Sequence, residues 1–319
     1  MSCSGKEIKK PNLFVVGVPK SGTSSLHTYL GRHPEIFMSV KKELQFFGKD
    51  FWEESDAFHK GKVTFPYRNL KDYLNFFSSA QNEKIFGEST TKYLFSKVAA
   101  NEIYKFNPNA KIIIILREPV DFLFSYHSQC LFDLVEDIAD FEKALDMETE
   151  RKKGVSIPPT TPVPSFAFYS EIVQFSEQIE RFLQVFKQEQ IKIIIFDDFK
   201  RNTLKVYKEI LDFLEVDSNF VTDFNIVNPN KKITQNFLYF LFLSPKYFWI
   251  REVIRIMLPI KIRAFISQTL RMFFITHGKR DALDKDLKLR LKKKYLSEII
   301  KLEKILKKSL IKLWNYDNL

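Results

Sequence analysis

A short loop with two glycines joins an apolar run to a helical pattern near the start of the chain. Leu13–Val16 is a β-branched and aromatic run of the kind that forms a buried strand, and Leu26, Tyr29 and Leu30 recur at helical spacing. A strand that turns through glycines into a helix directs several backbone N–H groups and the positive end of the helix dipole at one point. Residues 17–25 therefore predict a phosphate-binding loop, with an ordinary tight turn as the alternative.

The residue order in this loop differs from that of the common ATP-binding loop. Gly17 and Gly22 have the Walker spacing, but the two residues after the second glycine are Thr23 and Ser24. The lysine of the loop is Lys20, two residues before Gly22. Since a Walker lysine neutralises the β- and γ-phosphates, a displaced lysine indicates a phosphate ligand other than ATP with magnesium.

Three apolar runs without polar alternation predict the fold class. They are Leu13–Val16, Lys111–Leu116 and Ile191–Phe196. Runs of this kind form strands buried on both faces of a parallel sheet, and helical patterns lie between them over residues 24–30, 92–106 and 169–186. This alternation predicts an α/β fold of the P-loop type, a doubly wound parallel sheet flanked by helices, with ligands at the carboxyl ends of the strands.

Two further segments complete the predicted organisation. Val155–Pro164 contains four prolines and predicts an exposed loop. Leu283–Trp314 repeats apolar residues at three- and four-residue spacing against lysine-rich faces. It predicts one long amphipathic helix or two shorter ones, which makes the C-terminal region helical.

The charge and the cysteine count narrow the classes of partner and compartment. The chain of 319 residues has a formal net charge of +11, which implies anionic partners. Its two cysteines, Cys3 and Cys130, cannot build a disulfide framework or a zinc site, and residues 1–10 lack the apolar core of a signal peptide. A cytoplasmic location is the default expectation. Residues 237–275 mix apolar and basic side chains and predict a helical cap, with peripheral membrane contact as the alternative.

One segment offers a candidate general base. Residues 41–47, Lys-Lys-Glu-Leu-Gln-Phe-Phe, place Glu43 beside two lysines and ahead of two aromatic residues. A carboxylate in semi-apolar surroundings near cations suits a general base, and a solvated surface glutamate is the alternative. Glu88 and His127 are further candidates, although a structural or ligand-orienting role is favoured for His127.

Two other segments offer cations for a phosphate. Arg117 ends an apolar run, and Ser125 follows eight residues later on the next expected helix. The planar guanidinium suits a phosphate at the carboxyl end of a strand, and a salt bridge with Glu118 or Asp121 is the alternative. Residues 278–280 form a glycine-containing turn with two cations, for which a solvated basic loop is the alternative.

Together these segments resemble the sulfotransferases that use 3′-phosphoadenosine 5′-phosphosulfate, and they are most similar to the heparan sulfate N- and O-sulfotransferase type. The resemblance covers nearly the whole chain. It implies one sulfotransferase domain over residues 1–319, with an α/β core over 12–236 that holds the donor site and a basic helical part over 237–319. It also implies that Glu43 is the catalytic base and that Lys20 acts in catalysis.

The resemblance further implies a set of donor-binding residues. These are Pro19, Lys20, Ser21, Gly22, Thr23 and Ser24 at the 5′-phosphosulfate, Arg117 and Ser125 at the 3′-phosphate, and Gly278, Lys279 and Arg280 in a gate over the 3′-phosphate. No metal is expected, because a sulfuryl group carries less negative charge than a phosphoryl group and Lys20 with the helix N-terminus can offset that charge.

One position departs from the pattern of these enzymes. Residues 87–93, Gly-Glu-Ser-Thr-Thr-Lys-Tyr, resemble their Glu-Lys-Ser/Thr-Pro motif but carry Ser89 where the motif has its lysine. Lys41, Lys42 and Lys92 are the lysines that could substitute. The expected acceptor is a carbohydrate or another small molecule, with O- and N-sulfation both open.

Two other classes of function stay open at this stage. The first is a P-loop kinase or nucleotide phosphotransferase, with Asp197 holding magnesium at the end of a strand. The second is a basic protein that binds a membrane or nucleic acid through residues 237–275 and the lysine-rich C-terminal part. The sulfotransferase interpretation is favoured, and it includes no nucleic-acid partner.

Overall fold

The computed structural model describes residues 9–133, 135–225, 231–233, 275–277 and 282–319. The chain divides into two compact units. The first comprises Met1–Phe122, Glu171–Val227 and Leu291–Leu319, and the second comprises Leu123–Ser170 and Asn228–Arg290.

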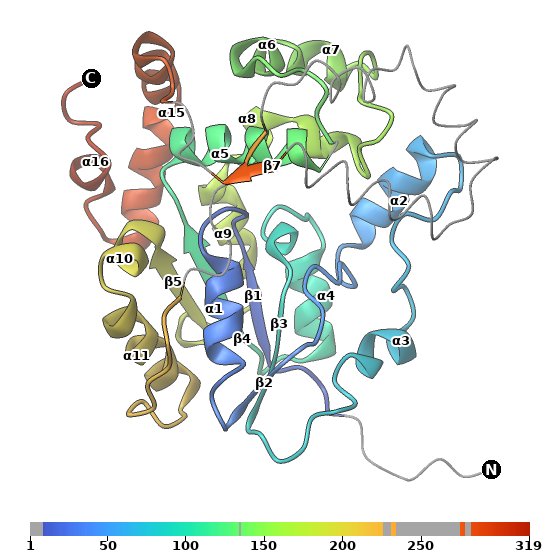
Figure 1. The fold of residues 1–319 in the computed structure, drawn as a ribbon, viewed down its shortest axis with the longest axis vertical. Coiled ribbons are helices and arrows are strands. Elements are labelled where there is room, and N and C mark those ends of the chain that lie inside the picture. Colours follow the sequence, from blue (N-terminus) through green and yellow to red (C-terminus); the bar gives the residue numbers. More distant parts are fainter. Residues whose placement is uncertain (1–8, 134, 226–230, 234–274, 278–281) are drawn as a thin grey trace. The chain divides into compact units, whose positions relative to one another are not determined.

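A five-stranded parallel sheet forms the centre of the first unit (Figure 1). Its strands lie in the order β2 (Ile36–Met38), β3 (Ile85–Ser89), β1 (Leu13–Gly17), β4 (Lys111–Leu116) and β5 (Ile191–Ile195). Every residue of β1 is buried, as expected for an apolar strand covered on both faces. β1 pairs with β3 on one side and with β4 on the other, so the order in which strands are added to the sheet reverses beside β1. In open α/β sheets, ligands bind at the carboxyl ends of the strands at such a switch point.

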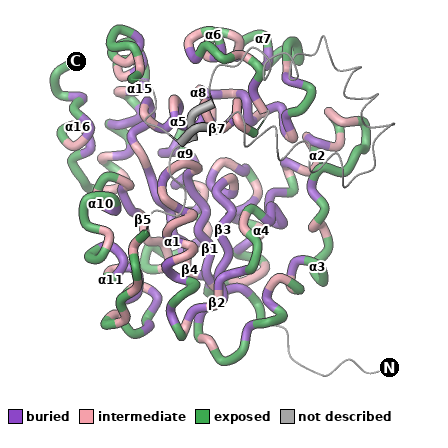
Figure 2. The backbone as a smooth tube through the Cα atoms, viewed as in Figure 1, coloured by how far each residue is buried: buried purple, intermediate pink, exposed green. Residues whose placement is uncertain are grey.

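Helices cover one face of the sheet through a continuous apolar cluster. Helices α1 (Thr23–Leu30) and α11 (Thr203–Leu214) contribute buried residues to it. Alternate residues of the strands join them, among them Leu13 and Val15 of β1. The purple segments of Figure 2 follow these strands and the inner faces of the helices.

The opposite face of the sheet packs against an aromatic layer. Phe14, which alternates with Leu13 along β1, meets the ring of Phe47 with 5.6 Å between centroids. Phe47 in turn lies 5.2 Å from the ring of Phe106 at the end of α4 (Ala99–Phe106). Both faces of the sheet are therefore covered, and the predicted doubly wound α/β fold is confirmed.

The remaining elements belong to the two units as follows. The first unit also contains α2 (Lys49–Phe58), α3 (Leu70–Asn75), η1 (Thr91–Tyr93), α9 (Phe175–Leu183), η3 (Gln188–Gln190), α10 (Phe196–Arg201) and α16 (Leu310–Leu313). The second contains α6 (Phe141–Asp146), α7 (Glu148–Lys152), η2 (Pro164–Ala167) and the antiparallel pair β6 (Lys231–Ile233) and β7 (Ile275–His277). Helices with residues in both units are α5 (Pro119–Phe132), α8 (Tyr169–Ile172) and α15 (Lys285–Leu306). Among the helices in these ranges, none has the length and apolar character needed to cross a bilayer.

An ion pair with no exposed surface lies inside the second unit. Arg151 donates from both terminal nitrogens to the Glu136 carboxylate at 2.6 Å, and the Tyr169 hydroxyl donates to the same carboxylate at 2.7 Å. Burial alone would raise the pKa of Glu136, but the hydrogen bonds and charge of Arg151 outweigh it and hold that pKa below its usual range. Removing either partner would leave the other charge buried without a counterion.

Several predicted boundaries are wrong where local turns interrupt the pattern. Residues 92–106 divide into η1 and α4, because the Ser96 hydroxyl accepts hydrogen bonds from the next turn and starts a new helix. Residues 169–186 divide into α8 and α9 at a tight turn in which Phe175 N donates to Val173 O at 2.8 Å.

Two other predicted segments come out in part. Val155–Pro164 is irregular as expected but not wholly exposed, since Thr161 and Val163 are fully buried. Of the two alternatives for the C-terminal pattern, one long helix or two shorter ones, the structure has two helices, α15 and α16. The predicted division at residue 237 stays a prediction, because residues 234–274 lie outside the described part of the chain.

Candidate active site

The loop after β1 is tied to the sheet and turns directly into α1. Val18 N donates to Ile115 O of β4 at 2.7 Å. Lys20 and Gly22 adopt left-handed backbone angles, with φ of 63° and 80°, and Gly22 does so without the steric cost of a side chain. Gly22 is the N-cap of α1, and no side chain in the described residues caps this helix. The first N–H groups of α1 are therefore free of side-chain capping, which suits an anion at the loop.

Arg117 lies at this loop, although it is 97 residues away in sequence. Its Nη1 donates to the carbonyl oxygen of Lys20 at 3.0 Å, and its guanidinium lies 5.2 Å from the ring centroid of Phe196. Burial lowers the pKa of Arg117, and the nearby acids Asp121, Asp197 and Glu118 oppose that shift. An arginine stays protonated under these conditions, so Arg117 brings a positive charge to the backbone of the loop.

Glu43 is held by the segment that follows β3. Although the residue as a whole is solvent-exposed, its carboxylate turns onto the buried Thr91 and accepts from the Thr91 hydroxyl at 2.9 Å. The Thr91 N–H donates to both carboxylate oxygens at 3.1 and 3.2 Å, and Gln45 Nε2 donates at 3.3 Å. The enclosing protein raises the pKa of the Glu43 carboxyl, while Lys42, Thr91 and Lys92 oppose that rise. A carboxylate with a raised pKa is a stronger base, which fits proton abstraction.

Lys42, next to Glu43, reaches the start of α1, directly after the loop. Its Nζ donates to the hydroxyl of Ser24 in the first turn of α1 at 2.6 Å. Further along α1, His27 Nδ1 lies 2.9 Å from the hydroxyl of Ser89 at the end of β3. Burial and the charge of Lys42 lower the pKa of His27 to about 4, so this imidazole is neutral near pH 7. Lys42 and Glu43 thus place a cation at the loop and a carboxylate beside it.

A family model described as the sulfotransferase domain matches residues 10–267, which is most of the chain. The protein belongs to the sulfotransferase family. This confirms the family inferred from the loop, the strand-end arginine and the Lys-Glu-Leu-Gln-Phe-Phe segment.

Relatives and a solved structure agree with this membership. The sulfotransferase is 32% identical over 124 residues, or 39% of its length, to the membrane-associated sulfotransferase kil1 of Dictyostelium discoideum. It is 25% identical over 217 residues, or 65% of its length, to human bifunctional heparan sulfate N-deacetylase/N-sulfotransferase 2. The matches span 24% and 22% of those two proteins, so about a quarter of each is represented. The crystal structure of a sulfotransferase from Alicyclobacillus acidocaldarius is similar with a TM-score of 0.69 at 25% identity, covering 95% of this chain and 98% of that one.

The other predicted donor-site residues of the sulfotransferase fall into three groups. Pro19, Ser21 and Thr23 lie in the loop, and Ser21 and Thr23 are buried. Ser125 is fully buried on α5 in the second unit. Gly278, Lys279 and Arg280 lie outside the described residues. The structure therefore brings Lys20, Ser24, Lys42, Glu43 and Arg117 to one end of the sheet, and the roles of Ser125 and of residues 278–280 stay predictions.

The two alternative candidates for the base, Glu88 and His127, are buried and form hydrogen bonds within the protein. Glu88 has no exposed surface and accepts from the Tyr73 hydroxyl at 3.0 Å and the Thr90 hydroxyl at 3.2 Å. Burial raises its pKa to about 8. The Nε2 atom of His127 lies 2.8 Å from Ile138 O, and burial lowers the pKa of this histidine. A buried acid and a buried imidazole of this kind serve packing better than proton transfer to a substrate.

The acid proposed for a kinase-type magnesium site also has a structural partner. Asp197, the second residue of α10, accepts a hydrogen bond from the indole nitrogen of Trp314 at 3.0 Å. The neighbouring Asp198 forms ion pairs with Arg201 and Lys308. These contacts attach the C-terminal segment to α10.

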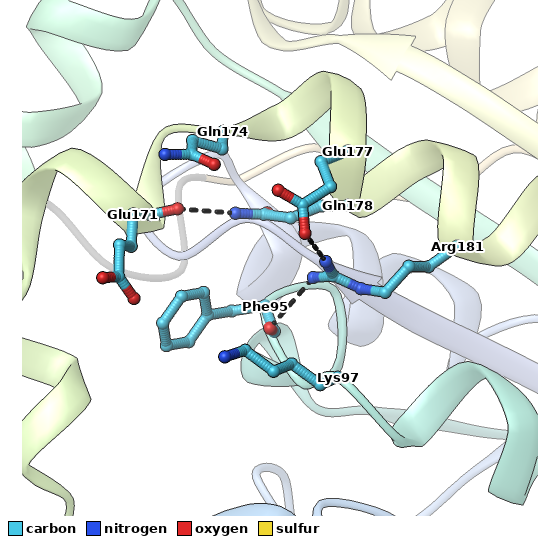
Figure 3. A pocket seen from close by; sticks show the side chains of 7 residues that line it. All are labelled: Phe95, Lys97, Glu171, Gln174, Glu177, Gln178 and Arg181. Atoms are coloured by element: carbon cyan, nitrogen blue, oxygen red, sulfur yellow. Dashed lines mark hydrogen bonds and ion pairs between the residues drawn. The ribbon is translucent and has the colours of Figure 1, made fainter.

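A polar cavity of about 220 Å³ contains a residue that the sequence does not single out (Figure 3). Arg181 of α9 lines it and donates to the carbonyl oxygens of Leu94 and Phe95 at 3.3 and 3.1 Å. It also pairs with Glu177 at 2.8 Å. Leu94 N in turn donates to Val16 O of β1. Arg181 therefore helps to hold Leu94 and Phe95, which follow η1, against the sheet. One arginine on an amphipathic helix carries no sequence signal for this role.

Proposed function

We propose that the protein transfers a sulfuryl group from 3′-phosphoadenosine 5′-phosphosulfate to a hydroxyl or amine of an acceptor. The observation that carries the proposal is the joining of Arg117 to the Lys20 loop, with the Glu43 carboxylate on the adjacent segment. A lysine and an arginine that are far apart in sequence but meet at one loop suit a nucleotide that bears phosphates at two positions. Membership of the sulfotransferase family supports the same donor.

The residues at the loop fit the donor in the following arrangement. Lys20 and the N-terminus of α1 hold the 5′-phosphosulfate with the hydroxyls of Thr23 and Ser24, and Arg117 holds the 3′-phosphate with Ser125. Glu43 takes the proton of the acceptor while the acceptor atom bonds to sulfur. The bond from sulfur to the bridging oxygen breaks, and its electron pair stays on the 5′-phosphate, where Lys20 stabilises the developing charge.

The acceptor class follows less directly from the chain. A carbohydrate or another small molecule fits the family, and the human relative described above is named as a heparan sulfate N-deacetylase/N-sulfotransferase. We also propose a cytoplasmic location, with peripheral membrane contact through residues 237–275 as the alternative to a helical cap. Nucleic acid is not a proposed partner.

The donor is tested by calorimetric binding of 3′-phosphoadenosine 5′-phosphate and of ADP without magnesium. We expect selective micromolar binding of the 3′,5′-bisphosphate, and at least a tenfold loss in Arg117→Ala, because a charged hydrogen bond contributes about 1.5–3 kcal/mol. Arg32→Ala is the matched control, since Arg32 donates to Asp223 O at the surface and away from the loop. Equal or tighter binding of ADP, or binding that requires magnesium, would favour the kinase alternative.

A further inference from the structure

The side chain of Lys42 contacts the proposed donor site at the start of α1 and does not extend into solvent. Its Nζ donates to Ser24 at 2.6 Å, and the side chain is only partly exposed. Within the described part of the chain, Lys42 forms no ion pair with a carboxylate, and Glu43 beside it turns its own carboxylate to Thr91. The nearby Glu43 charge offsets part of the charge of this half-buried ammonium, but the group to which it donates is a neutral hydroxyl, which favours an anionic ligand at that point.

The backbone around Lys42 fixes this direction. Glu43 N donates to Ser89 O at 2.9 Å, and Leu44 N donates to the Thr90 hydroxyl at 3.1 Å. Glu43 has a left-handed φ of 56°, a conformation that costs a non-glycine residue free energy and persists only when its surroundings impose it. This turn separates two adjacent side chains, so that Lys42 points to α1 and Glu43 to Thr91.

The titratable side chain of α1 that interacts with Lys42 carries no charge near pH 7. His27 is the nearest titratable residue on α1, and it is neutral near pH 7 because burial and Lys42 lower its pKa to about 4. Its Nδ1 pairs with Ser89, so these two side chains satisfy each other at the end of β3. Ser89, which stands where the Glu-Lys-Ser/Thr-Pro motif has its lysine, thus belongs to a neutral pair, and Lys42 brings a positive charge to Ser24.

We propose that Lys42 is a catalytic residue that binds the sulfuryl group of the donor, and this inference rests on the proposed function. When the donor binds, the ammonium passes from Ser24 to a sulfuryl oxygen. During transfer the acceptor atom bonds to sulfur and gives its proton to Glu43, while the bridging S–O bond breaks with its electron pair left on the 5′-phosphate. Lys42 stabilises negative charge on the sulfuryl group during its transfer, and Lys20 stabilises the charge that develops on the 5′-phosphate.

The test compares two ligands that differ by the sulfuryl group. Calorimetry measures binding of 3′-phosphoadenosine 5′-phosphosulfate and of 3′-phosphoadenosine 5′-phosphate to the wild type and to Lys42→Met. We expect the variant to bind the phosphosulfate about ten- to a hundredfold more weakly and the bisphosphate within about threefold of the wild type. Lys42→Arg should recover part of the loss, whereas Lys20→Met should weaken both ligands.

Lys41 provides the matched control. It is the adjacent lysine, but it is exposed, and its Nζ donates to the Tyr67 hydroxyl at 2.7 Å and lies 4.5 Å from the ring centroid of that residue. Lys41→Met should change neither affinity. Circular dichroism establishes that each variant is folded, and Lys42→Gln replaces Lys42→Met where the apolar side chain unfolds the protein.

The outcomes separate this inference from the proposed function. If the wild type binds both ligands and Lys42→Met weakens both equally or neither, the inference is overturned while the donor assignment stands. If the wild type binds neither ligand, the donor assignment fails and the inference fails with it.

Discussion

Replacing Gly17 with alanine tests whether the first glycine of the loop is required by packing. A Cβ at residue 17 would lie 2.4 Å from Leu94 Cδ2, 3.1 Å from its Cβ and 3.2 Å from its Cγ. Because the contact includes the base of the Leu94 side chain, a change of rotamer does not remove it, and Leu94 is 1% exposed. Overpacking costs about 1–3 kcal/mol, against which alanine regains about 0.5–1 kcal/mol over glycine in a strand. We expect Gly17→Ala to lower the free energy of unfolding by about 1–2 kcal/mol.

A double-mutant cycle gives this prediction its control. Leu94→Ala alone should cost about 2–5 kcal/mol, because it leaves a cavity beside β1. It also removes the atoms that Gly17→Ala would meet, apart from the Cβ at 3.1 Å. Adding Gly17→Ala to Leu94→Ala should therefore cost less than about 0.5 kcal/mol, a coupling of about 1–2 kcal/mol. Urea unfolding followed by circular dichroism measures all four proteins, and additive effects within about 0.5 kcal/mol would refute the packing argument.

Three other residues give further predictions. Glu43→Gln should lower turnover with a screened acceptor by about 10²- to 10⁴-fold and leave binding of the 3′,5′-bisphosphate nearly unchanged, because only the proton acceptor is removed; an unchanged rate would exclude Glu43 as the base. Arg151→Met should lower the free energy of unfolding by about 3–5 kcal/mol in urea, because it leaves Glu136 buried without its partner, and adding Glu136→Leu should restore much of it. The folded pKa of Glu88, about 8, lies above the ordinary value of 4.5, so its contribution to stability is complete below pH 4.5 and is lost as the pH rises towards 8. Glu88→Gln should flatten this fall in urea unfolding measured from pH 5 to 8, and an unaltered slope would contradict it.

The sequence predicts the strands that are uniformly apolar and fails for those that are not. β4 has the bounds predicted for it, Lys111–Leu116, because a short apolar run rich in β-branched residues favours a buried strand over a helix. β3 reads Ile-Phe-Gly-Glu-Ser and is nonetheless buried throughout, since Glu88 finds the hydroxyls of Tyr73 and Thr90. No local pattern reveals that a partner 15 residues away will satisfy a buried carboxyl.

The same limit divides the predicted site. The turn from β1 into α1 was predictable because its glycines, lysine and hydroxyls are contiguous, so that local geometry determines their arrangement; its phosphate-binding role stays a prediction. Arg117 was predictable in type and place, because the end of a parallel strand lies at the ligand edge of the sheet. Arg181 was not, since it acts through carbonyl oxygens of Leu94 and Phe95, and any residue type supplies those.

Left-handed backbone at three non-glycine residues connects these observations. Lys20, Glu43 and Gln45 have φ of 63°, 56° and 58°, and such conformations cost of order 1–3 kcal/mol each. Two of the three are the proposed leaving-group cation and the proposed base, and Lys42 lies directly before the second. Lys42 and Glu43 are adjacent, and their side chains reach different partners, Ser24 on α1 and Thr91 after β3. The left-handed turn at Glu43 lies where these two directions diverge, so that the proposed sulfuryl-binding cation is held at the loop while Thr91 holds the carboxylate of the proposed base.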